Sequence, residues 1–169
     1  MKSQIILCSG GARSGKSEFA ERWALATEGR KAYVATGQAF DDEMVDRIKK
    51  HQERRGNIWT NFEIPLYLAE EWQHISSVAD VILIDCLTMF TTNHMMAHGS
   101  IQGQQDANRL EDMVLSELEA LLNLIKVSDD KIVIFFDLYD IAPYVAGIPE
   151  FPINKEIISN LLNNQYKEI

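Results

Sequence analysis

The strongest structural signal in the sequence is Gly10-Gly11-Ala12-Arg13-Ser14-Gly15-Lys16-Ser17, which reads G-G-A-R-S-G-K-S. It follows the apolar run Ile5-Ile6-Leu7 and precedes a helical pattern, so it has the strand, loop and helix context of a phosphate loop. The glycines let the backbone curl until successive N–H groups face phosphate oxygens, and the following helix adds its positive amino end. The stretch therefore predicts binding of a nucleoside triphosphate.

A second stretch complements the loop. Lys16 is expected to reach the β- and γ-phosphates, and Ser17 to hold Mg²⁺ through its hydroxyl. The continuous apolar run at residues 81–85 ends in a carboxylate, Asp85, and predicts a buried strand whose acid lies at the ligand-binding rim of the sheet. Asp85 would then organise Mg²⁺ together with Ser17, as a Walker B acid does. The alternative is an aspartate that only caps a helix or a turn.

Strand-like runs alternate with helical ones along the whole chain. This alternation predicts one α/β domain over residues 1–169, with the three-layer P-loop NTPase (RecA-like) fold and a mainly parallel sheet. The predicted strands span residues 4–9, 31–35, 59–63, 81–85 and 131–136. The predicted helices span residues 16–27, 42–53, 66–74, 87–96, 105–126 and 154–167.

Composition bounds the setting. The chain has 169 residues, enough for one domain with its own core, and a net charge of -9 argues against a nucleic-acid-binding surface. Cys8 and Cys86 each lie at the end of an apolar run, which favours two buried thiols in a reducing compartment over a disulfide or a metal pair. Without a signal-peptide pattern or a membrane-length apolar run, we expect a cytoplasmic protein.

The segment at residues 41–56 reads as a helix with an acidic first turn, a basic last turn and a glycine stop. Arg47, His51, Arg54 and Arg55 recur at helical spacing and form one stripe. Such a stripe is usually a solvated basic face. Beside a bound phosphate, however, the guanidiniums would pair with phosphoryl oxygens and keep the imidazole neutral, which makes His51 a candidate nucleophile.

A family resemblance joins these features. The chain resembles the adenosylcobinamide kinase/adenosylcobinamide-phosphate guanylyltransferase family, bifunctional enzymes of cobalamin biosynthesis. The resemblance extends from about residue 5 to residue 93. It rests on the order and spacing of the phosphate loop, Tyr33-Val34-Ala35-Thr36, Asp41-Asp42-Glu43-Met44, Arg47-Ile48-x-x-His51, Arg54-Arg55-Gly56, Trp59 and Asp85-Cys86-Leu87-Thr88 through Asn93.

The resemblance implies a two-step reaction with ATP and GTP as substrates. A triphosphate phosphorylates adenosylcobinamide, and GTP then gives GMP to a histidine that corresponds to His51, before the GMP passes to the phosphorylated corrinoid. The implied guanine-binding carboxylate is Glu63. The implied nucleotide contacts are Gly10, Gly11, Ala12, Arg13, Ser14, Gly15, Lys16, Ser17, Ala35, Thr36, Gly37, Gln52, Glu53, Arg54, Arg55, Glu63 and Asp85.

The last third of the chain departs from the family pattern. The family continues with a T-N-E-V-G-x-G-I-V-P turn, a further helix and a last strand, whereas residues 135–143 here read F-F-D-L-Y-D-I-A-P and no final strand is predicted. Two alternatives therefore stay open. One is a P-loop kinase of another small alcohol or nucleotide, for which the loop and Asp85 suffice. The other is a nucleotide-binding homologue that has lost part of the activity.

Self-association is a further expectation. The family resemblance implies a trimer. In addition, the helix predicted at residues 105–126 carries an apolar stripe that is able to form a subunit contact or to pack on its own sheet. The stripe consists of Leu110, Met113, Val114, Leu118, Leu121, Leu122 and Ile125. The histidines outside the basic helix lie in polar or helix-end contexts, and we expect them at the surface; they are His74, His94 and His98.

Overall fold

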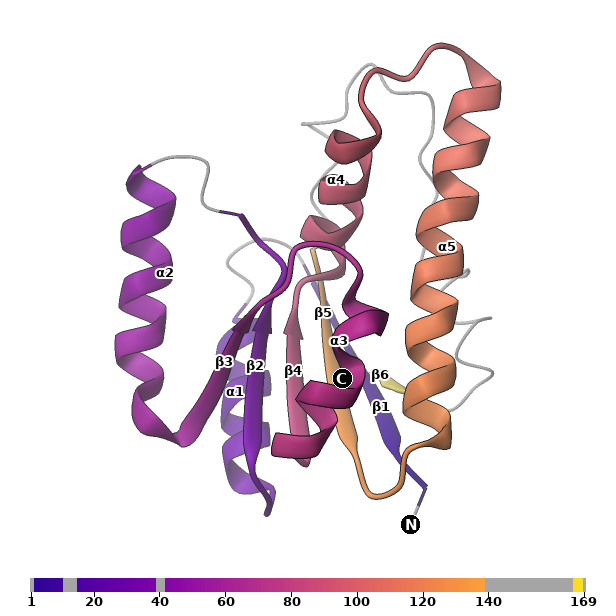
Figure 1. The fold of residues 1–169 in the computed structure, drawn as a ribbon. Coiled ribbons are helices and arrows are strands. Elements are labelled where there is room, and N and C mark those ends of the chain that lie inside the picture. Colours follow the sequence, from indigo (N-terminus) through magenta and orange to yellow (C-terminus); the bar gives the residue numbers. More distant parts are fainter. Residues whose placement is uncertain (1, 11–14, 39–41, 139–165, 169) are drawn as a thin grey trace.

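The computed structural model describes residues 2–10, 15–38, 42–138 and 166–168, and its strands form one sheet (Figure 1). The strand order is β3-β2-β4-β5-β1-β6, and all the paired neighbours are parallel. The strands are β1 (Gln4–Gly10), β2 (Lys31–Ala35), β3 (Trp59–Glu63), β4 (Val81–Asp85), β5 (Ile132–Leu138) and β6 (Tyr166–Glu168). The helices are α1 (Lys16–Ala26), α2 (Asp42–Arg55), the short 3-10 helix η1 (Gly56–Ile58), α3 (Leu68–Val78), α4 (Leu87–His98) and α5 (Gln104–Val127).

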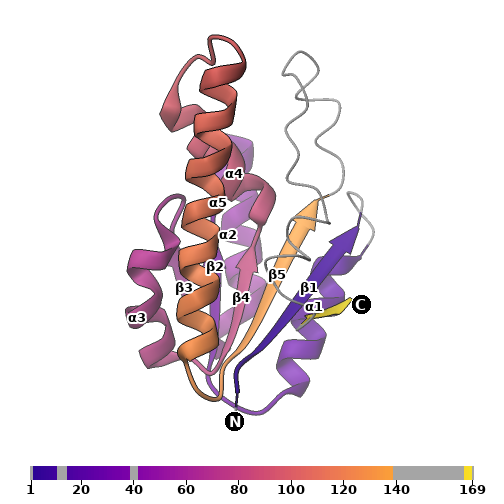
Figure 2. The same cartoon turned by 90° about the vertical axis from the view of Figure 1, so that its right-hand side faces the viewer.

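Helices cover both faces of this sheet, so the predicted three-layer α/β architecture is confirmed. On one face, Ala20 and Ala24 of α1 pack against a cluster that includes Ile6 and Leu83. On the other, α3, α4 and α5 bury apolar residues against the opposite sides of the same strands. Figure 2 shows α1 on the far side of the strands from α3 and α5. Burial on both faces explains why the central strands read as uninterrupted apolar runs.

The structure differs from the predicted elements most at α3 and around β6, and the other predicted bounds inside the described residues agree with the structure to within two residues. The helix predicted at residues 66–74 is α3, which begins later because Tyr67 has φ 53 and ends later because Ile75 is fully buried in the core. The absence of a final strand is wrong, since β6 pairs with β1 at Ile5↔Tyr166. The helix predicted at 154–167 overlaps β6 at its last two residues and otherwise lies outside the described residues. Backbone pairing with the edge of β1 outweighs local helix propensity there.

The burial of the cysteines and histidines tests two predictions about these side chains. Cys8 and Cys86 are both buried thiols outside any disulfide, as predicted, and burial raises the pKa of the Cys8 thiol. His74 and His98 are exposed, as predicted. The prediction that His94 lies at the surface is wrong, because His94 is 1% exposed and its ring packs against the rings of Phe90 and Tyr67. Burial lowers the pKa of His94, so its imidazole stays neutral.

The apolar stripe of α5 packs within this chain. Six of its seven predicted members are buried: Leu110, Val114, Leu118, Leu121, Leu122 and Ile125. Met113 is 37% exposed. The stripe therefore serves the core between α5, α3 and the sheet. In the part of the chain that the structure describes, no helix is long and apolar enough to cross a membrane.

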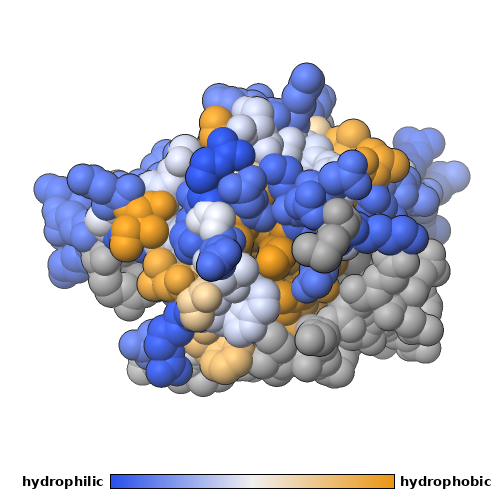
Figure 3. All heavy atoms as spheres, turned by 90° about the horizontal axis from the view of Figure 1, so that it is seen from below, coloured by the Kyte–Doolittle hydropathy of each residue, from blue (hydrophilic) through white to orange (hydrophobic). Residues whose placement is uncertain are grey.

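A charged cluster holds the amino ends of three strands. Asp80, directly before β4, accepts hydrogen bonds at Oδ2 from the backbone N and Nε of Arg30 at 2.9 and 3.1 Å. Its Oδ1 accepts from Nη2 of Arg30 at 3.0 Å and from Nζ of Lys131 at 3.4 Å. Arg30 precedes β2 and Lys131 precedes β5. Figure 3 views the molecule from this end, where hydrophilic residues surround smaller hydrophobic areas.

We expect Asp80→Asn to lower the Tm by about 2–4 °C at pH 7, because it removes charge-assisted hydrogen bonds. Hydrogen bonds from Arg30 hold the pKa of Asp80 well below its usual range. This contribution is present above the unfolded-state pKa of about 3.9 and is lost as pH falls through the lower folded-state pKa. Thermal unfolding should therefore show a gap between the two proteins that narrows below about pH 4. The exposed Asp112→Asn is the control, and a gap that persists unchanged into acid would contradict the assignment.

Candidate functional site

The carboxyl edge of the sheet gathers the residues that the sequence singled out. β1 ends at Gly10, β2 at Ala35, β3 at Glu63 and β4 at Asp85. All four strands run in parallel, so their carboxyl ends meet at one edge of the sheet. Ligands of open α/β sheets bind at this edge. The predicted nucleotide contacts on different strands therefore share one side of the molecule.

The phosphate-loop sequence leads into α1 at this edge. Residues 11–14 lie outside the described part of the chain. Gly15 is the N-cap of α1 with φ 83 and ψ 4, a left-handed conformation that glycine adopts without a steric cost. Lys16 and Ser17 occupy the first turn, and both are half-buried. The positive end of an 11-residue helix thus opens beside the end of β1, where it favours an anion.

Asp85 is held by a neighbouring strand. Its Oδ2 accepts a hydrogen bond from the hydroxyl of Tyr33. The residue that caps α4 is Cys86, whose Sγ accepts from the backbone N of Met89 at 3.5 Å. The helix-cap alternative for Asp85 is therefore not the arrangement found. The Asp85–Cys86 peptide bond is cis.

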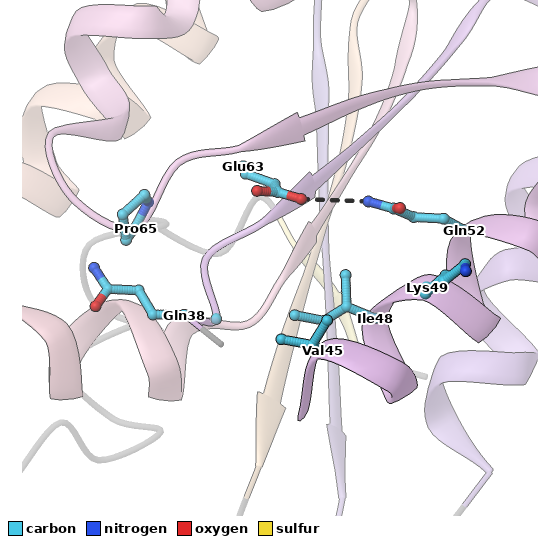
Figure 4. Close-up of a pocket in the computed structure, with 8 residues that line it drawn as sticks. Gln38, Val45, Ile48, Lys49, Gln52, Glu63 and Pro65 are labelled. Atoms are coloured by element: carbon cyan, nitrogen blue, oxygen red, sulfur yellow. Dashed lines mark hydrogen bonds between the residues drawn. The ribbon is translucent and has the colours of Figure 1, made fainter. Parts of the chain in front are cut away.

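A pocket of about 460 Å³ lies between α2 and the ends of β2 and β3 (Figure 4). Its lining residues are Gly37, Gln38, Val45, Ile48, Lys49, Gln52, Glu63 and Pro65. Nε2 of Gln52 donates to Oε1 of the exposed Glu63 at 3.3 Å. Apolar side chains of α2 face a carboxylate from β3 across this space. Such a combination suits a flat, largely apolar ring that carries N–H donors at one edge.

Asn93 of α4 ties the two segments that form the pocket's strand side. Its Nδ2 donates to the carbonyl of Thr36 at 2.6 Å and to the carbonyl of Pro65 at 3.0 Å. The hydroxyl of Thr36 donates to the Cys86 carbonyl at 2.7 Å and accepts from the Cys86 N–H at 2.8 Å. These bonds fix the chain after β2 and after β3 against α4, and so hold the strand side of the pocket in place.

The helix α2 carries His51 next to the pocket-lining Gln52. Nothing is described of the side chains of Arg47, His51 and Arg54, so the predicted basic stripe is placed only by its backbone. The exposed Glu53 is on the same helix. The roles predicted for these residues stay predictions.

Arg55, the last residue of α2, turns inward. Its side chain is 6% exposed, and its Nε lies 3.4 Å from Oε1 of Glu21 in α1. Its Nη1 donates to Oδ1 of Asn61 at 3.5 Å, and its guanidinium carbon lies 3.2 Å from the ring centroid of Tyr33. Arg55 therefore bridges α1, β2 and β3, an arrangement that the spacing of the stripe did not indicate.

Sequence reasoning missed several residues that build this site. Tyr33 belongs to the family pattern, but its position in the sequence indicates no role. Glu21 and Asn61 carried no signal beyond their polarity. Val45 also lines the pocket, beside the Ile48 of the family pattern, and only the 3.6-residue period of α2 could have placed Val45 near Gln52 on the helix surface.

A phosphate-loop sequence at the carboxyl edge of an all-parallel sheet, with Asp85 two strands away from β1, defines a P-loop nucleotide-binding α/β protein. The fold is similar to that of a prototypical ATPase from the type III secretion system of pathogenic bacteria. That likeness has a TM-score of 0.59 at 12% identity and covers 98% of this chain and 51% of the other, so it concerns the fold alone. The sequence pattern of the CobU family, cobinamide kinase / cobinamide phosphate guanyltransferase, matches residues 6–137, and the chain belongs to this family.

Sequence similarity to three named proteins supports membership of this family. The chain is 40% identical over 116 residues to the bifunctional adenosylcobalamin biosynthesis protein CobP of Pseudomonas aeruginosa, and the match covers 69% of this chain. It is 32% identical over 127 residues to CobU of Escherichia coli and 34% identical over 127 residues to CobU of Salmonella typhimurium. The matches cover 61%, 66% and 66% of these relatives' own lengths, so the chain spans just under two thirds of each.

Proposed function

We propose that this protein phosphorylates adenosylcobinamide and then transfers GMP from GTP to adenosylcobinamide phosphate through a guanylyl group on His51. Family membership over residues 6–137 supports the reaction class. The observation that carries the assignment to this site is the pocket, because it sets the helix that bears His51 against Glu63 at the edge where β1 meets the phosphate-loop sequence.

The two steps use different phosphorus atoms of a triphosphate. In the kinase step, the corrinoid hydroxyl attacks the γ-phosphorus, loses its proton and releases the nucleoside diphosphate. In the second step, the neutral imidazole of His51 attacks the α-phosphorus of GTP, and the bond to the bridging oxygen breaks so that pyrophosphate leaves. The phosphate of adenosylcobinamide phosphate then displaces the imidazole. Lys16 would stabilise the charge that develops on the phosphates.

Magnesium fits the donors at this edge. Ser17 offers a hydroxyl and Asp85 a carboxylate, and both are the oxygen ligands that Mg²⁺ prefers. Magnesium bound beside nucleotide phosphates takes only one or two protein ligands, so this small set suffices. When bound, the ion neutralises phosphate charge.

The pocket supports recognition of guanine. Glu63 would accept hydrogen bonds from the N1–H and the exocyclic amine of the base, and the apolar side chains Val45 and Ile48 would contact its ring. Gln52 now occupies one oxygen of this carboxylate at 3.3 Å, which holds it toward the pocket. Adenine offers no N1–H, so the same carboxylate would discriminate against it.

We expect Glu63→Gln to weaken GTP binding about 10-fold or more and to leave ATP binding within about twofold. The loss corresponds to a hydrogen bond with a charged partner, about 1.5–3 kcal/mol. Isothermal titration with GTP, inosine triphosphate and ATP measures the effect. The exposed Glu70→Gln in α3 is the matched control. Equal losses for GTP and ATP would remove Glu63 from base recognition.

The reaction itself is tested with adenosylcobinamide, ATP, GTP and Mg²⁺, and the products are identified by mass spectrometry. The proposal expects adenosylcobinamide phosphate and then adenosylcobinamide-GDP. A P-loop kinase of other specificity would form neither corrinoid product. A nucleotide-binding homologue that has lost the second activity would accumulate the phosphate alone, or bind nucleotide without turnover.

We further propose that residues 1–169 act as one nucleotide-binding domain in the cytoplasm and that the protein is a homo-oligomer, a trimer by resemblance to related enzymes. Because the α5 stripe is largely buried within the chain, it does not support self-association, and the proposal rests on the family. Light scattering of the protein at micromolar concentration measures the oligomeric state.

A further inference from the structure

Tyr33 lies where four elements meet, and it takes no part in the two proposed reaction steps. It is 4% exposed in β2, and its ring packs perpendicular to the ring of Trp59 of β3 at a centroid distance of 6.2 Å. Its hydroxyl donates to Oδ2 of Asp85. Ala35 pairs with Asp85 in the parallel register, so Tyr33 lies two positions earlier on the same face of the sheet. The long ring spans that distance to the carboxylate.

Arg55 packs over the face of the Tyr33 ring. Its guanidinium carbon lies 3.2 Å from the ring centroid, within the range of a cation–π contact. The guanidinium is held in turn by Glu21 at 3.4 Å, in a pair whose side chains are 6% and 12% exposed. With Trp59 packed perpendicular to the ring and Arg55 over its face, the ring has little rotational freedom, and its hydroxyl is held toward Asp85.

Tyr33 is the donor in its contact with Asp85, because a carboxylate oxygen only accepts hydrogen bonds. A donor at Oδ2 limits rotation of the Asp85 carboxyl group and thereby fixes the direction of its other oxygen. Donors of this kind orient metal-binding carboxylates, and their loss typically costs 10- to 100-fold in metal affinity.

We propose that Tyr33 is a positioning residue that aims the carboxylate of Asp85 at the divalent cation bound with the nucleotide. The inference rests on the proposed function, because it takes Asp85 as a ligand of that cation. Tyr33 touches neither substrate nor cation in this role and acts only through Asp85.

The test is the affinity of Mn²⁺ for the protein–GTP complex, measured by electron paramagnetic resonance of free Mn²⁺. Tyr33→Phe keeps the ring, the Arg55 contact and the Trp59 contact, and removes only the hydroxyl. We expect it to weaken Mn²⁺ binding about 10-fold or more. GTP affinity in EDTA should stay within about twofold, and thermal unfolding should show a folded protein. Tyr67→Phe, at an exposed tyrosine before α3, is the matched control and should match the parent protein.

Asp85→Asn separates failure of this inference from failure of the proposed metal site. If Asp85→Asn leaves Mn²⁺ affinity unchanged, the metal role of Asp85 is wrong and the inference fails with it. If Asp85→Asn weakens Mn²⁺ binding but Tyr33→Phe does not, only the inference is overturned. In the Asp85→Asn background, Tyr33→Phe should have no further effect. A full additive loss there would show that Tyr33 acts by another route and would overturn the proposal.

Discussion

Lys16→Ala is expected to lower the rate of phosphoryl transfer about 100- to 1,000-fold, because it removes the cation that we propose to contact the β- and γ-phosphates. Stabilisation of transition-state charge by one such group is worth about 3–4 kcal/mol. The side chain lies in the first turn of α1 and is half-buried, outside the clusters that form the core. Folding should therefore change little. The measurement is the turnover of adenosylcobinamide with ATP or GTP, together with triphosphate affinity and the Tm.

Lys2→Ala is the matched control for this variant. Lys2 is exposed and precedes β1 at the opposite edge of the sheet from Lys16, so its loss should leave turnover unchanged. If Lys16→Ala turned over at the parent rate, the phosphate-loop assignment would be wrong. A large fall in Tm that accompanied the loss of activity would instead indicate a structural role for Lys16.

Most of the fold could be predicted from local sequence, because the central strands are buried on both faces of the sheet and therefore read as apolar runs. Val81–Asp85 is uniformly apolar before its final acid, and its bounds agree with the prediction. The error at α3 has a different cause. The left-handed Tyr67 shifts the helix start, and no residue type at that position signals a positive φ. The strand β6 depends on an open edge of β1, which a local pattern does not report.

The site was predicted to the extent that its residues follow strand ends. Asp85 and the phosphate loop follow from strand, loop and helix context, whereas Glu63 entered only through the family resemblance. The contact between Tyr33 and Arg55 joins β2 to the end of α2. That contact depends on how α2 returns to the sheet through Gly56, where φ is 60, and not on spacing along either element. Tertiary placement thus turned one member of a predicted basic stripe into a buried bridge.

His51→Asn is expected to abolish the covalent GMP adduct while triphosphate binding and the kinase step remain. The imidazole is the group that would attack the α-phosphorus, and asparagine keeps similar polarity without a nucleophilic nitrogen. The phosphate loop and Asp85, to which the proposed function assigns the kinase step, are left intact. Incubation with α-labelled GTP, followed by denaturing electrophoresis, measures the adduct. The phosphoramidate bond should be labile to acid and to hydroxylamine.

His98→Asn is the matched control, because His98 is an exposed histidine at the end of α4 and should label like the parent protein. His51, in contrast, directly precedes the pocket-lining Gln52 in the chain, so the two histidines are expected to label differently. A solvated helix histidine would predict equal labelling in both variants. Mass spectrometry then locates the modified residue in the parent protein, and an adduct on any residue other than His51 would refute the guanylyl-carrier assignment while leaving the kinase step to stand on Lys16 and Asp85.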